Sequence, residues 1–373
     1  MQNPLLLPEP HGYTLRMRRL LACLAVIVAL FGSGSVLTRR ALARSDDRNL
    51  PLAVPAPGMR PTPLIPSAVV AASAQNPSAR NTGPSDRLSL EGTWNFSTLT
   101  PLERPAEFST RPSIGLPEAV QYEKQVMQRN NADRRDGPVE ADVARAYNDA
   151  WYDRGLHMAV VNGQAHTSLI VDPPDGRLPP LTPDAAGRLA TRAQSRREHP
   201  ADGPEDRSLA ERCLSFNAGP PVLPGPYNNY LQIFVFDKEV VILNEMIHDA
   251  RIIATDGRPH AAARIRKFMG DSVGHWEGGT LVVDTTNFTD ETNFRGASDR
   301  LHLIERFTRI DADTLLYDFQ VNDATSFTKP WRVELPMKAT DERIFEYACH
   351  EGNEALVGIL RGARFEERQG SPR

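Results

Sequence analysis

The sequence predicts a mainly β protein, in which an antiparallel meander closes as a β-barrel or, as the alternative, stacks as a β-sandwich. From Tyr230 onward, strand-like runs alternate with short turns, and Gly278-Gly279 between two such runs is a strong hairpin signal. A long meander must close or stack, because open sheet edges promote aggregation. The sequence has no apparent internal repeat, which argues against a propeller.

Residues 1–43 have the composition of an export signal or an N-terminal anchor. A basic region precedes an uncharged apolar run at 20–37, and small residues suited to cleavage follow at 41–43. The apolar run is also long enough to remain uncleaved in a membrane. We therefore expect bacterial export to the periplasm or the medium, with membrane contact only through an uncleaved N-terminal segment.

Residues 44–87 form a linker rich in Pro, Ala and Ser, with eight prolines. It has too few large apolar side chains to offset the entropy lost on ordering, so we expect a disordered tether. A single β-barrel-like domain is expected at 88–373, with helical insertions at about 116–197. The chain has a formal net charge of −4, and without a strongly basic surface nucleic acid is not an expected partner.

The domain is predicted to begin with a strand and then helices. A short strand is expected at 90–96. The segment 116–130 carries apolar residues at helical spacing, and 140–155 is a second helical segment that ends at a glycine. Thr182 as a cap and Pro183 in the first turn predict another helix start.

Hairpins dominate the remainder of the chain. Strand runs are predicted to pair at 230–237 with 239–246, 301–310 with 314–323, and 331–337 with 343–349. A short helix is predicted at 261–269, where it interrupts the series of strands. The stretch at 240–253 is interpreted as one long strand, because apolar β-branched residues lie at both of its ends.

Two cysteines remain once the leader is removed, Cys213 and Cys349. An even pair in an exported chain predicts a disulfide, which would stabilise the fold by about 4–5 kcal/mol in the chain-entropy model. Two free buried thiols are the alternative. Cysteines this far apart do not match a zinc pattern, and we predict no metal site.

Several long motifs resemble a family of exported bacterial proteins of unknown function. The resemblance covers most of the chain after residue 90, and it transfers no catalytic residues. The motifs that carry it lie at 98–105, 146–155, 168–183, 211–221, 240–253, 270–288 and 345–353.

A shorter motif, Gly92-Thr93-Trp94 on the first strand before a meander, is similar to lipocalin-like barrels. The resemblance implies that Trp94 plugs the barrel base and that a late arginine, Arg361 or Arg364, packs against it.

The polar residues of 240–253 are candidate site residues. Strand alternation places Asn244, Met246 and His248 on one face, and Asp249 and Arg251 on the other. The first face could line a ligand cavity, with His248 as a catalytic or a structural residue. Arg251 is a further candidate for binding a ligand.

Glu305 shares its strand face with large apolar residues, which predicts a buried carboxylate. Burial raises the pKa of a carboxyl and suits it to acid or base work. The alternative is an ion pair with Arg251 or Arg295. Tyr147 and Trp151 are four residues apart in the predicted helical segment, so they either stack on a ligand or pack in the core.

These residues predict an exported protein that binds a small, partly apolar molecule in a barrel cavity. The first alternative is a hydrolase, lyase or isomerase that uses His248 and Glu305 as an acid–base pair without a cofactor. The second is an envelope structural or adhesion module. The sequence contains no nucleophile elbow, phosphate loop, HExxH or dinucleotide fingerprint, and we predict no cofactor.

Overall fold

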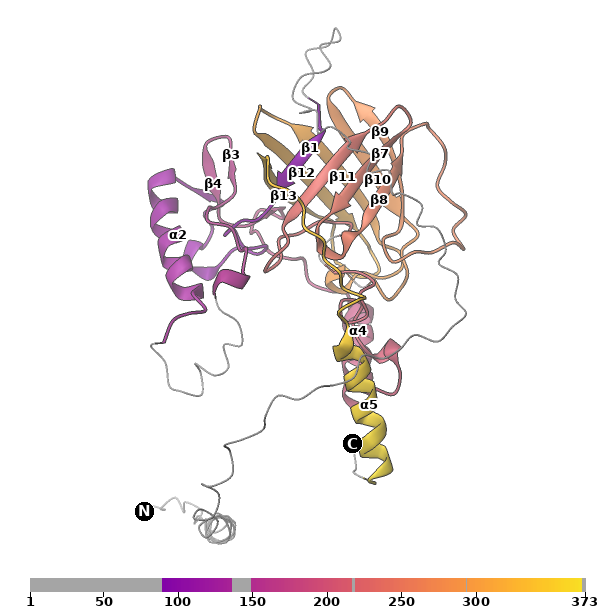
Figure 1. Ribbon diagram of the computed structural model, residues 1–373. Helices are drawn as coiled ribbons and strands as arrows, with labels where there is room; N and C mark the ends of the chain where they lie inside the picture. Colours follow the sequence, from indigo (N-terminus) through magenta and orange to yellow (C-terminus); the bar gives the residue numbers. More distant parts are fainter. Residues whose placement is uncertain (1–88, 136–148, 217–218, 293, 371–373) are drawn as a thin grey trace, which may run out of the picture. The chain divides into compact units, whose positions relative to one another are not determined.

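The computed structural model describes residues 89–135, 149–216, 219–292 and 294–370, which all belong to one compact unit (Figure 1). The predicted leader at 1–43, the linker at 44–87 and Tyr147 lie outside the described residues. Among the helices of the described part, none has the length and apolar character needed to cross a membrane.

Within the described residues, nine strands close into a barrel, which confirms the predicted β-barrel. β1 pairs with β6 on one side and with the end of β13 on the other, and this closes the ring. A tenth strand, β5 (Ile170–Asp172), pairs with the start of β13. In order around the ring, the barrel strands are β1 (Gly92–Asn95), β6 (Tyr230–Val235), β7 (Glu239–Asn244), β8 (Ala250–Ala254), β9 (Asp271–Glu277), β10 (Thr280–Thr286), β11 (His302–Arg309), β12 (Thr314–Asn322) and β13 (Trp331–Thr340).

One neighbouring pair in the ring is parallel, so the sheet is not purely an antiparallel meander. β8 and β9 run in the same direction and are joined by the crossover segment 255–270. The prediction of a helix at 261–269 is wrong. The backbone of this stretch forms hydrogen bonds with the segment that follows β10 instead. The Lys267 N–H donates to the Asn287 carbonyl at 3.0 Å, and the Lys267 carbonyl accepts from the Thr289 N–H at 3.1 Å.

The single long strand predicted at 240–253 is also wrong. The chain reverses after Asn244, and β7 pairs antiparallel with β8. Ile247 and His248 make the reversal with positive φ angles of 62° and 59°. This left-handed conformation is uncommon outside glycine and asparagine, so the residue types gave no turn signal.

Trp94, which the lipocalin-like resemblance singles out, is part of the buried core. Its side chain is buried, and its indole N–H donates to the Leu90 carbonyl at 3.0 Å. The guanidinium of Arg309 lies 5.3 Å from the Trp94 ring centroid and donates to the Ser89 carbonyl at 2.8 Å. A cation over an aromatic face is an attractive contact, and here it joins β11 to β1.

The arginine expected in this position was Arg361 or Arg364, and that expectation is wrong. Both lie on the C-terminal helix α5 (Glu354–Arg368), where Arg364 donates to the carbonyls of Ala201 and Asp202. The strand run at 343–349 is also wrong, because no strand forms there and the chain continues into α5.

Two further helices begin where the sequence predicts them. Of the helical segment predicted at 140–155, the structure describes 149–155, which contains a 3₁₀ turn and no α-helix. α2 (Leu116–Asn130) packs a buried face on a small sheet of β2 (Ser113–Ile114), β4 (Gln164–His166) and β3 (Val160–Val161). α4 (Pro183–Glu198) begins after Thr182, whose hydroxyl accepts from the Ala185 N–H at 3.2 Å. Short 3₁₀ turns lie at Ala106–Phe108, Asp149–Trp151, Pro204–Asp206, Met246–His248 and Phe294–Gly296.

The predicted disulfide is confirmed. Cys213 and Cys349 are bonded, with 5.8 Å between their Cα atoms and a sequence separation of 136. The bond ties the segment that follows α4 to the segment that precedes α5.

Candidate functional site

A buried ion pair crosses the barrel interior between Arg251 on β8 and Glu305 on β11. Their side chains are 5% and 0% exposed. The guanidinium donates to both carboxylate oxygens: Nη1 reaches Oε1 at 2.9 Å, and Nη2 bonds Oε2. The alternative prediction for Glu305, an ion pair with Arg251, is therefore confirmed. The pairing explains how a charged side chain is tolerated inside the barrel.

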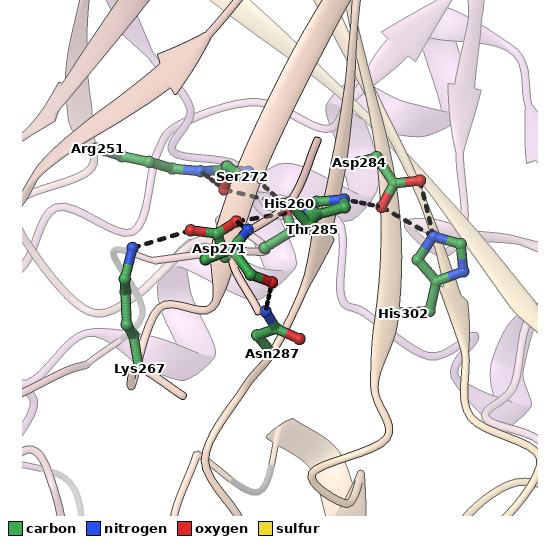
Figure 2. A network of polar contacts seen from close by, with 10 residues as sticks. Arg251, His260, Lys267, Asp271, Ser272, Asp284, Thr285, Asn287 and His302 are labelled. Atoms are coloured by element: carbon green, nitrogen blue, oxygen red, sulfur yellow. Dashed lines mark hydrogen bonds and ion pairs between the residues drawn. The ribbon is translucent and has the colours of Figure 1, made fainter. Parts of the chain in front are cut away.

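The remaining polar groups around this pair are also satisfied. Arg251 donates to the hydroxyls of Ser272 at 3.0 Å and Thr285 at 2.8 Å (Figure 2). Tyr317 donates to Glu305 at 2.7 Å and accepts from the Val222 N–H at 3.1 Å. Burial and the adjacent carboxylate raise the pKa of Tyr317 far above its ordinary value. The network holds Glu305 in place and leaves it no route to a substrate.

The rest of the barrel interior is packed with apolar side chains. Phe307, Phe319, Leu335 and Met337 are fully buried in one continuous core. The segment 220–223 belongs to the same core, and Val222 is the residue whose N–H reaches Tyr317. The three pockets described below all lie outside this ring of strands.

His248 and Glu305 are not brought together. His248 is exposed at the β7–β8 turn, and its Nδ1 lies 3.2 Å from the Tyr347 carbonyl. Glu305 is enclosed in the barrel. Of the other predicted ligand contacts, Met246 is 1% exposed, whereas Trp151 is 69% exposed.

Asn244 and Asp249 form the last pair of the β7–β8 hairpin, where the Asn244 N–H donates to the Asp249 carbonyl at 2.9 Å. Asn244 Oδ1 and Asp249 Oδ2 are buried, and neither has a hydrogen-bond partner among the described residues. Burial raises the pKa of Asp249 to about 6, against the opposing effect of His248 and His350. This carboxyl therefore titrates well above the ordinary range of aspartate.

A second polar network lies on the outer wall of the barrel (Figure 2). Asp271, Asp284 and His302 project from β9, β10 and β11, and His260 reaches them from the crossover segment. Asp284 faces outward because its neighbour Thr285 bonds Arg251 inside.

His260 lies between two carboxylates. Its Nδ1 is 3.2 Å from Asp271 Oδ2, and its Nε2 is 3.1 Å from Asp284 Oδ1. Nε2 of His302 lies 3.0 Å from both oxygens of Asp284, while its other ring nitrogen points away from the network in Figure 2. The four residues thus form one continuous chain, to which Lys267 adds an ion pair with Asp271 at 2.9 Å.

The charges in this chain stabilise one another. Burial alone would raise the pKa of Asp284, but the hydrogen bonds and charges of His302 and His260 outweigh it and hold the pKa below its ordinary value. The hydrogen bond that the Asp284 carboxylate accepts in turn raises the pKa of His302. Within the described residues, no three His, Cys, Asp or Glu side chains are grouped so that they could hold a metal ion. The network ties the crossover segment to the barrel wall.

The best candidate for a ligand-binding site is a groove beside helix α2. It consists of two adjoining pockets of about 400 and 170 Å³ that share Leu99, Asn130 and Arg154. We call it the α2 groove. The larger pocket is bordered by residues 98–102 and 223–226, and its apolar lining includes Leu99, Leu102, Val126, Leu169 and Leu223.

Close backbone packing builds this groove. The Leu99 N–H donates to the His157 carbonyl at 2.9 Å, and the Asp153 N–H donates to the Pro226 carbonyl at 2.8 Å. Gly155 has a φ of 75°, and a Cβ there would lie 2.7 Å from the Thr98 nitrogen, so only glycine fits.

Two polar side chains of the smaller pocket distinguish it from a plain apolar cleft. The Arg154 guanidinium lies 3.5 Å from the Tyr152 ring centroid. Burial raises the pKa of Asp153, against the opposing hydrogen bond of Asn229, and Asp153 Oδ2 has no hydrogen-bond partner among the described residues. The sequence did not single out Arg154, because its partners in the groove are far away along the chain.

A third pocket, of about 520 Å³, lies between α4 and residues 289–299. Its arginines are already engaged with nearby groups. Arg192 lies 3.5 Å from Asp290, Arg266 lies 3.3 Å from Asp299, and Arg188 donates to the Ser326 hydroxyl at 2.9 Å. The charges of this wall largely neutralise one another.

The chain matches no family model, no curated protein and no solved structure. The resemblance to an exported bacterial family therefore stays a prediction.

Proposed function

We propose that this protein binds a small, partly apolar molecule, and that the site is the α2 groove rather than the barrel interior. The observation that carries the proposal is the pocket of about 400 Å³ with mostly apolar walls and a few polar groups. Ligand sites in proteins typically have this size and this lining. We favour binding over acid–base catalysis because His248 and Glu305 lie apart.

We also propose that the protein works outside the cytoplasm. The N-terminal residues have the composition of an export signal. The Cys213–Cys349 disulfide supports the same proposal, since such bonds persist in oxidising compartments.

Native mass spectrometry of the full chain tests the binding proposal by detecting a retained compound. Leu99 borders both pockets of the groove, so Leu99→Trp should fill it and abolish the retained mass. Leu189 lines the separate 520 Å³ pocket, and Leu189→Trp is the matched control that should keep the compound. Loss from both variants, or from neither, would contradict the proposed site.

A further inference from the structure

We infer that the ligand of the α2 groove is an apolar molecule that carries a carboxylate, and that Arg154 and Arg295 recognise this group. The inference rests on the proposed function and adds the chemical class of the ligand.

The larger pocket carries positive side chains. Its lining contains two arginines and no aspartate or glutamate, and the other side chains are apolar, hydroxyl or amide groups. The 520 Å³ pocket is different, because Asp290, Glu291 and Asp299 line it together with its three arginines. Two arginines in a lining that contains no carboxylate favour an anionic guest, because opposite charges attract strongly at short range.

The contacts of the Arg154 guanidinium fix its position in the pocket lining. Its ring contact with Tyr152 fixes the guanidinium plane, and Nη1 donates to the Asn130 carbonyl at 3.1 Å and to Asp149 at 3.3 Å. Asp149 borders only the smaller pocket, and its side chain is 48% exposed, so this pair neutralises Arg154 weakly. The described contacts leave Nε and Nη2 available, and two parallel donors match the geometry of a carboxylate.

Arg295 also lines the larger pocket, from the loop between β10 and β11. Its neighbours anchor the loop: Phe294 stacks on Trp331 with 5.9 Å between ring centroids, and Gly296 packs closely against Leu181. Arg295 itself has φ 52° and ψ 24°, a conformation that non-glycine residues adopt rarely and often at functional sites. No hydrogen bond or ion pair of its side chain is found among the described residues, so the exposed guanidinium is available to a ligand.

The apolar walls decide between a bare anion and an anion with an apolar body. Five aliphatic side chains line the larger pocket beside its polar groups: Leu99, Leu102, Val126, Leu169 and Leu223. An inorganic anion would leave these walls in contact with water, whereas a hydrocarbon body would cover them.

Isothermal titration calorimetry of the full, oxidised chain can separate charge from apolar contact. The probes are decanoate, decanol and decyltrimethylammonium, each below its aggregation concentration. We expect decanoate to bind at least tenfold more tightly than decanol, and decyltrimethylammonium to bind more weakly than either. Raising the salt concentration should weaken decanoate binding and leave decanol binding unchanged.

Charge-removing variants then assign the recognition to named residues. Arg154→Gln and Arg295→Gln should each weaken decanoate binding about tenfold while leaving decanol affinity unchanged. Arg177 is exposed and lies outside the pocket lining, so Arg177→Gln is a control for net charge and should change neither affinity. Should Arg154→Gln fail to fold, Arg295→Gln still decides the outcome, because the Arg295 side chain has no hydrogen bond or ion pair to lose among the described residues.

The possible failures are distinguishable. Equal binding of decanoate and decanol, or unchanged decanoate affinity in both arginine variants, overturns the carboxylate inference and leaves the binding proposal standing. An absence of binding by all three probes overturns the inference as well. The proposed function then depends on the compound retained by wild type and lost by Leu99→Trp.

Discussion

Replacing Arg251 by methionine should be among the most destabilising single substitutions in the barrel. Methionine keeps much of the apolar volume but removes both donors to Glu305, whose side chain is 0% exposed. Among the described residues, the Glu305 carboxylate then keeps one hydrogen-bond donor, the Tyr317 hydroxyl at 2.7 Å. Breaking a buried pair from one side in this way costs about 3–5 kcal/mol, because an uncompensated charge stays buried.

The double substitution Arg251→Met with Glu305→Leu should cost less than either single one. It removes both charges, and the Ser272 and Thr285 hydroxyls keep their mutual contact at 3.0 Å. The main loss is then the acceptor of the Tyr317 hydroxyl, worth about 1–3 kcal/mol.

Urea denaturation of the full chain with its disulfide intact measures these free energies of unfolding. Arg258→Met is the matched control, since Arg258 pairs with Asp256 at an exposed turn and its loss should have no measurable effect. If the double variant were as unstable as the sum of the two single variants, the argument from an uncompensated buried charge would be refuted.

Three other predictions concern charges and the disulfide. The His302–Asp284 pair should stabilise the fold most between about pH 4 and 6.5, because the raised pKa of His302 makes its contribution disappear at higher pH and the lowered pKa of Asp284 makes it disappear in acid. Urea titrations of His302→Gln and wild type across pH should show this window, and a constant difference from pH 4 to 9 would contradict it. Asp249→Asn should raise the free energy of unfolding at pH 8 and leave it unchanged near pH 3, because the unfolded carboxyl ionises from about pH 3.8 whereas the folded one ionises near pH 6. Replacing Cys213 and Cys349 together by serine should lower the free energy of unfolding by about 4–5 kcal/mol, given a loop of this length, and two free thiols in nonreduced peptide mass maps would contradict the bond.

The barrel could be predicted because its strands alternate and most of its turns carry recognisable residues. The β7–β8 turn could not, since Ile247 and His248 adopt left-handed conformations that their residue types do not favour. The crossover segment at 261–269 has helical residues, but backbone pairing between Lys267 and residues 287–289 overrides that preference. Local sequence patterns do not contain such long-range pairing.

The polar sites, too, were predictable where local sequence determines them and unpredictable where distant segments meet. Alternation along β11 placed Glu305 inside, and Arg251 was one of the two partners that the sequence offered. The outer network could not be foreseen, because His260 and His302 belong to separate elements that only the closed barrel brings to one carboxylate. Arg154 was missed for the same reason, since its groove is assembled from six separate parts of the chain.

The barrel interior is filled by a buried ion pair and apolar side chains, which explains why the candidate ligand site lies outside it. A buried charge pair requires its neighbours to satisfy the remaining donors and acceptors, and here Ser272, Thr285 and Tyr317 do so. Those residues, together with the aromatic core, fill the space that a simple barrel would leave for a ligand. The proposed recognition therefore lies with the groove outside the barrel, which includes residues of α2 and Arg154 and borders the core at Leu169 and Leu223. Substitution of the exposed groove residue Arg295 should therefore alter binding with little effect on stability, whereas substitutions at Arg251 or Glu305 should act on stability first.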